Sequence, residues 1–292
     1  MLEKFFKLKE NGTNVKTEII AGITSFMTMA YILAVNPSIM SAAGMDHGAV
    51  FTATALAAFI GTLAMALFAN YPFALAPGMG LNAYMAFTVC GNMGYSWQIA
   101  LLAVFVEGLI FIVLSLTNVR EAIFNAIPMA LKKGVSAGIG LFIAFIGLQG
   151  ANLVVNDDST LLTYVKFVGD FHTIGIGALL ALIGLFIIVV LHHKNIKGSI
   201  LIGILATWIL GMICEAIGLY VPDGKEFYSL YPTFRMIDFG AFGTTFGQCF
   251  NVDFSGVDIL NFIAVLFAFL FVDIFDTLGT LIGVSTKANM LD

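Results

Sequence analysis

The stretch FLFVDIFDTLGTLIGV, residues 269–284, decides the fold because it places two aspartates inside a long apolar segment. Taken from residue 259 to residue 284, that segment would form a helix about 39 Å long, enough to cross a bilayer. Asp273, Asp276, Thr277 and Thr280 fall at helical spacing on one face. An aspartate at mid-bilayer costs about 2.5–3.5 kcal/mol on insertion scales. The polar face is therefore predicted to serve a function.

The composition predicts an integral membrane protein that contacts the lipid bilayer. Hydrophobic residues make up 60% of the sequence and charged residues 11%, whereas a soluble domain carries about 25% charged residues. No basic patch or zinc-finger spacing suggests binding to nucleic acid, and the three cysteines show no paired spacing. The sequence holds no P-loop, HExxH or G-x-S-x-G motif. We therefore expect a protein that is not an enzyme, with no metal and no cofactor.

The fold class predicted from the chain is an all-α membrane protein with about eight transmembrane segments. Residues 1–18 are expected to be a cytoplasmic N-terminal segment, residues 220–257 an external loop, and residues 258–292 the eighth segment. Residues 19–219 hold the other seven segments, predicted at 19–39, 50–69, 72–91, 97–116, 134–148, 174–191 and 199–219. Asn36-Pro37 is expected to bend or end the first of these. Residues 120–133 are expected to lie along the membrane surface as an interfacial helix.

The third segment, PFALAPGMGLNAYMAFTVCG at residues 72–91, is predicted to be broken. Its prolines and glycines favour an extended piece over residues 73–76, followed by a half-helix over residues 81–90. Non-helical backbone at membrane depth lines a cavity or is buried in protein, and in transporters such breaks point to the binding site. Asn82, in the first turn of the half-helix, could contact a ligand there. It could equally cap or pack the start of the helix.

Two further features bear on orientation and proton movement. Most lysines and arginines fall on one predicted side of the membrane, which puts the N-terminus in the cytoplasm of a multi-pass protein of the cell membrane. Glu107 lies inside the fourth segment, where it could belong to a proton path or could be a hydrogen-bonded structural residue. His192 and His193 end the sixth segment at a basic loop, where a surface role is expected.

Three stretches resemble one family of transporters. They are APGMGLNAY (residues 76–84), REAIFNAIPMALKKGVSAGIGLFIAFIGLQ (residues 120–149) and FVDIFDTLGTLIGVSTKANM (residues 271–290). They are similar to the AzgA-like adenine, guanine and hypoxanthine permeases of the nucleobase–ascorbate superfamily. The resemblance implies fourteen segments in two inverted repeats of seven, with a core domain and a gate domain working by alternating access. Residues 19–219 would then be the first repeat.

The resemblance also implies roles for particular residues. Asp273 would hydrogen-bond a purine base, Asp276 would be a second essential acid, and Asn82 would line the site. Phe73 would lie near the base, and Thr277 shares the acidic face of the eighth segment. The family transports purine nucleobases with protons, so the proton gradient is the expected driving force, and its members suggest a homodimer. Asp273 and Asp276 are three positions apart and away from water, so one of them can carry a proton near neutral pH. The proton-coupling candidates are Asp276 and, from the fourth segment, Glu107.

The resemblance further implies that the chain is a C-terminally truncated permease, because it stops soon after the second repeat begins. We expect the 292-residue chain alone to transport nothing, which robust purine uptake in a permease-deficient cell would refute. The alternatives are a cation channel with an acidic ring, a related-fold anion or other small-solute transporter, and a structural role in which the aspartates join helices. The absence of lysine and arginine from the predicted segments argues against an anion site.

Overall fold

The computed structural model describes residues 5–10, 12–117, 126, 128–165, 167, 170–223, 227–232, 239–254 and 257–287. The chain divides into two compact units. The first unit comprises Met1–Ile32, Ala58–Ala76 and Phe145–Met236. The second unit comprises Leu33–Ala57, Pro77–Ala144 and Ile237–Asp292. The sequence predicts domain boundaries after residues 18, 219 and 257. These boundaries are based on membrane crossings and not on packing, and they stay a prediction.

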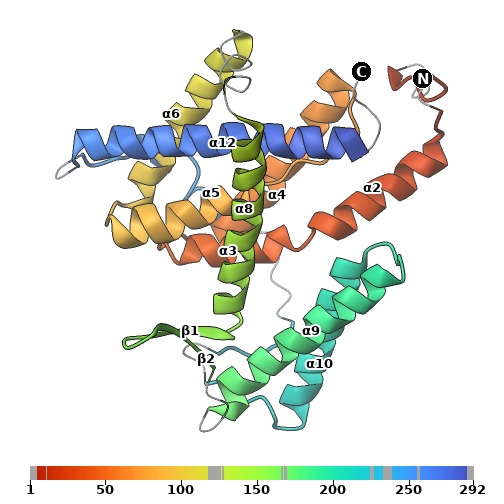
Figure 1. Ribbon diagram of the computed structural model, residues 1–292, viewed down its shortest axis with the longest axis vertical. Helices are drawn as coiled ribbons and strands as arrows, with labels where there is room; N and C mark the ends of the chain where they lie inside the picture. Colours follow the sequence, from red (N-terminus) through yellow and green to blue (C-terminus); the bar gives the residue numbers. More distant parts are fainter. Residues whose placement is uncertain are drawn as a thin grey trace. The chain divides into compact units, whose positions relative to one another are not determined.

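The described chain is mostly helical (Figure 1). The α-helices are α2 (Val15–Met29), α3 (Ile32–Ser41), α4 (His47–Ala64), α5 (Met79–Ala83), α6 (Trp97–Leu116), α8 (Met129–Gly150), α9 (Ile176–His193), α10 (Ser199–Ala216), α11 (Phe239–Phe242) and α12 (Ile259–Lys287). The wider π-helical turns are η1 (Met65–Ala69), η2 (Tyr84–Asn92) and η3 (Phe171–Gly175), and η4 (Gln248–Phe250) is a short 3-10 helix.

Six helical stretches in the described part are long and apolar enough to cross a membrane. They are Val15–Ser41, His47–Ala69, Trp97–Leu116, Phe171–His193, Ser199–Ala216 and Ile259–Leu281. These match six of the eight predicted segments. The other two are the third segment, which is broken, and α8, whose apolar part Gly140–Gly150 is shorter. By length, the described residues therefore support six of the eight predicted segments, and the total of eight stays a prediction.

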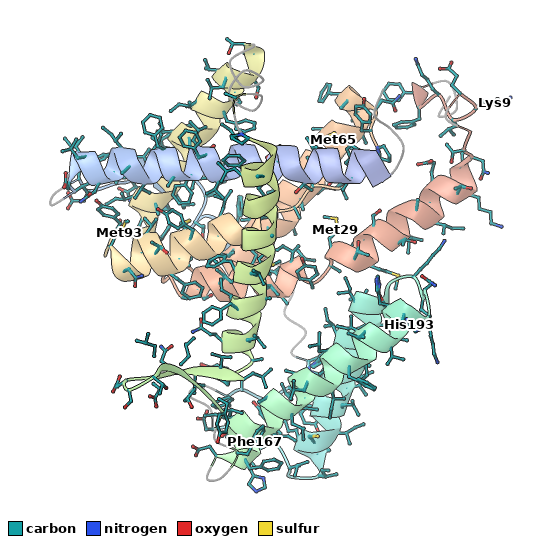
Figure 2. The ribbon with its side chains drawn as sticks, viewed as in Figure 1. Lys9, Met29, Met65, Met93, Phe167 and His193 are labelled. Carbon is teal, nitrogen blue, oxygen red and sulfur yellow. The ribbon has the colours of Figure 1, made fainter. Side chains whose placement is uncertain are left out.

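The first span is interrupted earlier than the sequence predicts. Helix α2 ends at Met29, marked in Figure 2, and α3 continues through Pro37 without a break. Of the two expectations for Asn36-Pro37, that it would bend or end this span, the ending is therefore wrong, and the bend stays a prediction. Near the end of α2 the hydroxyl of Thr28 donates to the Ser25 carbonyl at 2.7 Å, and such backward bonds from hydroxyl groups bend helices.

The third segment is broken, as predicted. Residues 70–78 are neither helix nor strand, and the chain becomes helical at Met79, two residues before the predicted start. In the first unit, Leu75 donates its backbone N–H to the Thr62 hydroxyl oxygen at 2.9 Å, and that hydroxyl donates to the Leu75 carbonyl at 3.3 Å. A side chain thus satisfies backbone groups that a helix would have paired, which makes the break tolerable in an apolar setting.

Two features of the middle of the chain differ from the prediction. Strands β1 (Val154–Asp157) and β2 (Leu161–Tyr164) form an antiparallel hairpin, so the described fold is not purely α. The Asp157 carboxylate accepts from the backbone N–H of Ser159 and Thr160 and closes the turn. Helix α8 begins directly after Pro128, so residues 129–133 extend the fifth segment. The rest of the predicted interfacial helix, apart from Ala126 and Pro128, lies outside the described residues.

Helices α9 and α10 form the packed centre of the first unit and lie side by side (Figure 1). A Cβ atom added at Gly203 would stand 2.2 Å from Ile188 Cγ1, and one added at Gly184 would stand 2.3 Å from Thr207 Oγ1. Small residues therefore set the distance between these helices. His193 ends α9 with its side chain exposed, in agreement with the predicted surface position (Figure 2).

In the second unit, α12 packs against α6 and also contacts α5. Phe269 and Ile274 of α12 are almost fully buried. The ring of Phe269 meets Tyr84 of η2 edge to face, with ring centroids 5.2 Å apart. These apolar contacts hold the acidic helix against the half-helix of the third segment, and so position the residues singled out from the sequence.

Candidate functional site

The acidic face of α12 lies inside the second unit. Asp273, Asp276 and Thr277 are each partly buried. The Thr277 hydroxyl donates to Asp273 Oδ1 at 3.3 Å, across one helical turn. The sequence spacing therefore places the three polar side chains as predicted, and the threonine helps to orient one of the acids.

Asp276 lies against the start of the half-helix. A Cβ atom added at Gly78, the residue before α5, would stand 3.1 Å from Asp276 Oδ2. The carboxylate therefore approaches the backbone where the third segment becomes helical, and glycine leaves the room for it. Figure 1 shows α12 and α5 in the same part of the second unit, where they contact each other.

Asn82 takes part in a buried hydrogen-bond relay that the sequence did not reveal. Its side-chain Nδ2 donates to Asn36 Oδ1 of α3, and Asn36 Nδ2 donates to Thr54 Oγ1 of α4 at 2.7 Å. The Thr54 hydroxyl donates in turn to the Val50 carbonyl at 2.7 Å. Asn36 is 6% exposed and Thr54 is 2% exposed. The relay therefore joins three helices through polar groups removed from solvent.

A signal for this relay is present in the sequence. An asparagine inside an apolar span is costly unless it is hydrogen-bonded, and in membranes such residues commonly bond across helices. Asn36 was interpreted only through its neighbour Pro37, as a helix breaker. Thr54 carries no signal of its own, because a threonine in a helix can satisfy itself on the preceding turn.

Glu107 of α6 is 5% exposed, and its Oε1 atom has no hydrogen-bond partner among the described residues. It lies close enough to Asp273 of α12 for the two carboxyl groups to interact electrostatically. A buried polar atom without a hydrogen bond, such as Oε1, is unusual among the described residues. Both interpretations of Glu107, a proton path and a structural role, stay predictions.

Phe73 lies in the extended piece of the third segment and stacks on Tyr71, with ring centroids 5.5 Å apart and planes 6° apart. It belongs to the first unit, and its place near the base stays a prediction. The structure brings the other singled-out residues into the second unit. We use the name acid–amide cluster for two sets of polar residues of the second unit, the hydrogen-bonded Asn36, Thr54 and Asn82, and the acids Glu107, Asp273 and Asp276.

The acid–amide cluster offers hydrogen bonding and proton exchange. Carboxylates accept hydrogen bonds, amides both donate and accept, and a carboxyl group can gain or lose a proton. Among the described residues no group of three His, Cys, Asp or Glu side chains could hold a metal ion. The cluster thus suits a polar, uncharged solute with several N–H and C=O groups.

Comparison with known proteins assigns the chain to a family. A family model described as "Permease family" matches residues 16–291, nearly the whole sequence. The chain belongs to this permease family. It is a multi-pass membrane protein of a transporter family and not an enzyme, and the resemblance predicted from its sequence motifs is confirmed.

Individual permeases cover the chain from end to end. A Methanocaldococcus jannaschii protein, named as a permease without a stated substrate, is 48% identical over 100% of this chain. The guanine/hypoxanthine permease PbuO of Bacillus subtilis is 46% identical over 98% of the chain, and the adenine permease AdeQ of Escherichia coli is 40% identical over 100%. The chain spans 62%, 62% and 61% of the lengths of these three permeases.

Proposed function

We propose that the full-length protein containing this sequence is a purine nucleobase–proton symporter that works by alternating access. The observation that carries the proposal is the acid–amide cluster, found in a chain 46% and 40% identical to permeases named for guanine/hypoxanthine and adenine. The protein would lie in the cytoplasmic membrane with its N-terminus in the cytoplasm, and would form a homodimer. The lysine and arginine distribution supports that orientation.

Asp273 is the proposed contact to the purine. A carboxylate on a partly buried helix face can accept two N–H bonds from the edge of a base, and such charge-assisted bonds are about twice as strong as neutral ones. The bond from Thr277 to Asp273 Oδ1 supports a fixed orientation of that carboxylate. Asn82 supplies its amide group to the same ligand.

Glu107 and Asp276 are the proposed proton-coupling residues. A buried carboxylate needs hydrogen-bond donors to stabilise its charge, whereas the neutral carboxylic acid does not. Glu107, with no donor to Oε1 among the described residues, is therefore suited to carrying a proton. Glu107 interacts electrostatically with Asp273. A base bound at Asp273 therefore alters the charge that Glu107 experiences, which would link substrate binding to proton binding. Asp276, three residues from Asp273, is the second group through which that link could run.

The test uses the full-length protein in cells that lack purine uptake. Asp273→Asn should lower the uptake of labelled hypoxanthine or adenine at low concentration by about tenfold or more, the size expected for a lost charge-assisted bond. Asp258→Asn is the matched control at the start of the same helix. Asp258 makes local hydrogen bonds at the start of α12, accepting from Leu260 N and from Asn261 Nδ2, each at 3.0 Å, and its replacement should leave uptake intact. Normal purine affinity in Asp273→Asn would sink the substrate assignment.

Coupling of purine uptake to protons is tested by a separate measurement, the dependence of uptake on external pH. The uptake of labelled purine is measured between about pH 5 and pH 8 in the wild type, Glu107→Gln and Asp276→Asn. Removal of the proton-carrying group should abolish the dependence of uptake on external pH while saturable uptake remains. Unchanged pH dependence in both variants would exclude these two residues as the coupling groups.

A further inference from the structure

The hydrogen bonds of the Asn82–Asn36–Thr54 relay can run in only one direction. Thr54 Oγ1 and the Val50 carbonyl oxygen are 2.7 Å apart, and two oxygens at that distance repel unless a hydrogen lies between them. A carbonyl cannot donate, so the single hydroxyl hydrogen of Thr54 points to Val50. Thr54 Oγ1 must then accept from its other neighbour, Asn36.

That constraint passes from residue to residue. Because Thr54 Oγ1 accepts, Asn36 must turn its NH₂ group toward α4, and its carbonyl oxygen then faces Asn82. Asn82 must in turn offer its NH₂ group to Asn36. The orientations of both amides, which otherwise have to be assigned from their surroundings, follow here from one backbone carbonyl. Within the described residues, Asn82 Oδ1 accepts no hydrogen bond and remains available to a ligand.

We propose that Asn36 and Thr54 are positioning residues that make Asn82 present its carbonyl oxygen, an acceptor, to an N–H group of the transported base. The proposal rests on the proposed function and adds a rule of specificity to it. A base with an N–H at that position fits the site, whereas a base with a bare nitrogen or a methyl group there does not.

Thr54→Val should reverse the relay. Valine accepts no hydrogen bond, so the Asn36 NH₂ group would be buried without an acceptor beside α4. An unpaired carbonyl oxygen is better tolerated than an unpaired N–H group. Asn36 should therefore turn over and donate to Asn82, whose own carbonyl oxygen is then occupied. Asn82 would now present its NH₂ group to the base, and the preferred ligand would change from a donor to an acceptor.

The chain offers a matched control and a rescue for this substitution. Thr52 lies on the same helix and is also 2% exposed. Within the described part of the chain its hydroxyl bonds only to the Gly48 carbonyl, at 3.0 Å. Thr52→Val therefore removes a buried hydroxyl from α4 without touching the relay. Thr54→Ser keeps the hydroxyl and should behave like the wild type.

The experiment measures inhibition of labelled hypoxanthine uptake by unlabelled hypoxanthine and by its 1-, 3-, 7- and 9-methyl derivatives in the full-length protein. In the wild type, the derivative that blocks the N–H read by Asn82 should inhibit worst. In Thr54→Val the ratio of its inhibition constant to that of hypoxanthine should fall by about threefold or more. Thr52→Val and Thr54→Ser should keep the wild-type ratio. A uniform change across all compounds in Thr54→Val, with no change of ratio, would overturn the proposal.

A second measurement needs no transport. Melting temperatures in detergent are compared for Thr54→Val, Asn82→Ala and the double variant, and for the same cycle with Thr52→Val. If the relay exists, the melting-temperature shifts of Thr54→Val and Asn82→Ala should not be additive, although Asn36 separates the two side chains. The shifts of Thr52→Val and Asn82→Ala should be additive. Additive shifts in both cycles would overturn the relay. If the wild type takes up no purine, the proposed function and the specificity rule fail, while this cycle still tests the relay.

Discussion

The α9–α10 pair of the first unit and the acid–amide cluster of the second unit join membrane-length helices in opposite ways. The pair is held by close contact: Gly184 and Gly203 leave room for Thr207 and Ile188. The cluster is held by polar side chains buried between helices, among them Asn36 and Thr54. Close packing around glycine is rigid and chemically inert, whereas buried polar groups are costly to maintain. The first arrangement therefore suits stability, and the second suits the ligand binding that we propose for it.

The glutamates of the two units also differ in how fully their carboxyl groups are hydrogen-bonded. In the first unit, both carboxylate oxygens of Glu215 are hydrogen-bonded, by Ser229 Oγ at 2.6 Å and Leu230 N at 2.7 Å. In the described part of the second unit, Oε1 of Glu107 is buried without a hydrogen-bond partner. A fully paired carboxylate anchors a loop to the end of a helix. A carboxyl group with an unpaired oxygen remains available for a change of protonation or for a ligand.

The largest expected effect comes from filling the space between α9 and α10. A Cβ atom at position 203 would stand 2.2 Å from Ile188 Cγ1, so Gly203→Ala should lower the free energy of unfolding by about 3 kcal/mol. The measurement is the melting temperature of the purified protein, together with its folded yield. Gly177→Ala is the control, because a Cβ there meets nothing within 4 Å. Equal stability of the two variants would contradict the packing argument.

A smaller effect, on uptake and not on stability, is expected at the start of the half-helix. In Gly78→Ala the new Cβ would meet Asp276 Oδ2 at 3.1 Å, tight enough to displace the carboxylate. Purine uptake by the full-length protein at low concentration should fall by about fivefold, while the melting temperature changes little. Gly108→Ala, where nothing lies within 4 Å, should leave both unchanged. A fall in melting temperature large enough to explain the lost uptake would contradict this prediction. It would show that Gly78, like Gly184 and Gly203, is needed for packing.

The sequence predicted those parts of the fold that depend on local composition. The apolar run with Asp273 and Asp276, and the break near Pro77-Gly78, were both identified correctly, because hydropathy and backbone restrictions act over a few residues. The hairpin at residues 154–164 was missed, since two four-residue strands give little periodic signal. The helix does not end at Pro37, one of the two outcomes predicted for Asn36-Pro37, because a proline inside a helix is tolerated where neighbouring groups in a membrane protein compensate for the lost bond.

The candidate site was predicted only in part, for a related reason. The acids of α12 are visible as charges in an apolar segment, so Asp273 and Asp276 could be named without a structure. The bond between Asn36 and Asn82 joins residues 46 positions apart, and the proximity of Glu107 to Asp273 depends on how α6 packs on α12. Neither contact follows from spacing along one helix. A single sequence predicts which residues are costly, and packing decides which of them meet.

The smallest expected effect tests the paired carboxylate of the first unit. Ser229→Ala removes one of the two bonds to Glu215 and should lower the free energy of unfolding by about 1 kcal/mol, the usual value of a single hydrogen bond. Purine uptake per folded molecule should not change, because Glu215 is assigned to stability alone. In a Glu215→Leu background the effect of Ser229→Ala should nearly vanish, which a double-mutant cycle on melting temperature measures. Loss of uptake in Ser229→Ala at normal stability would show that this paired carboxylate also serves transport, and the contrast with Glu107 would then fail.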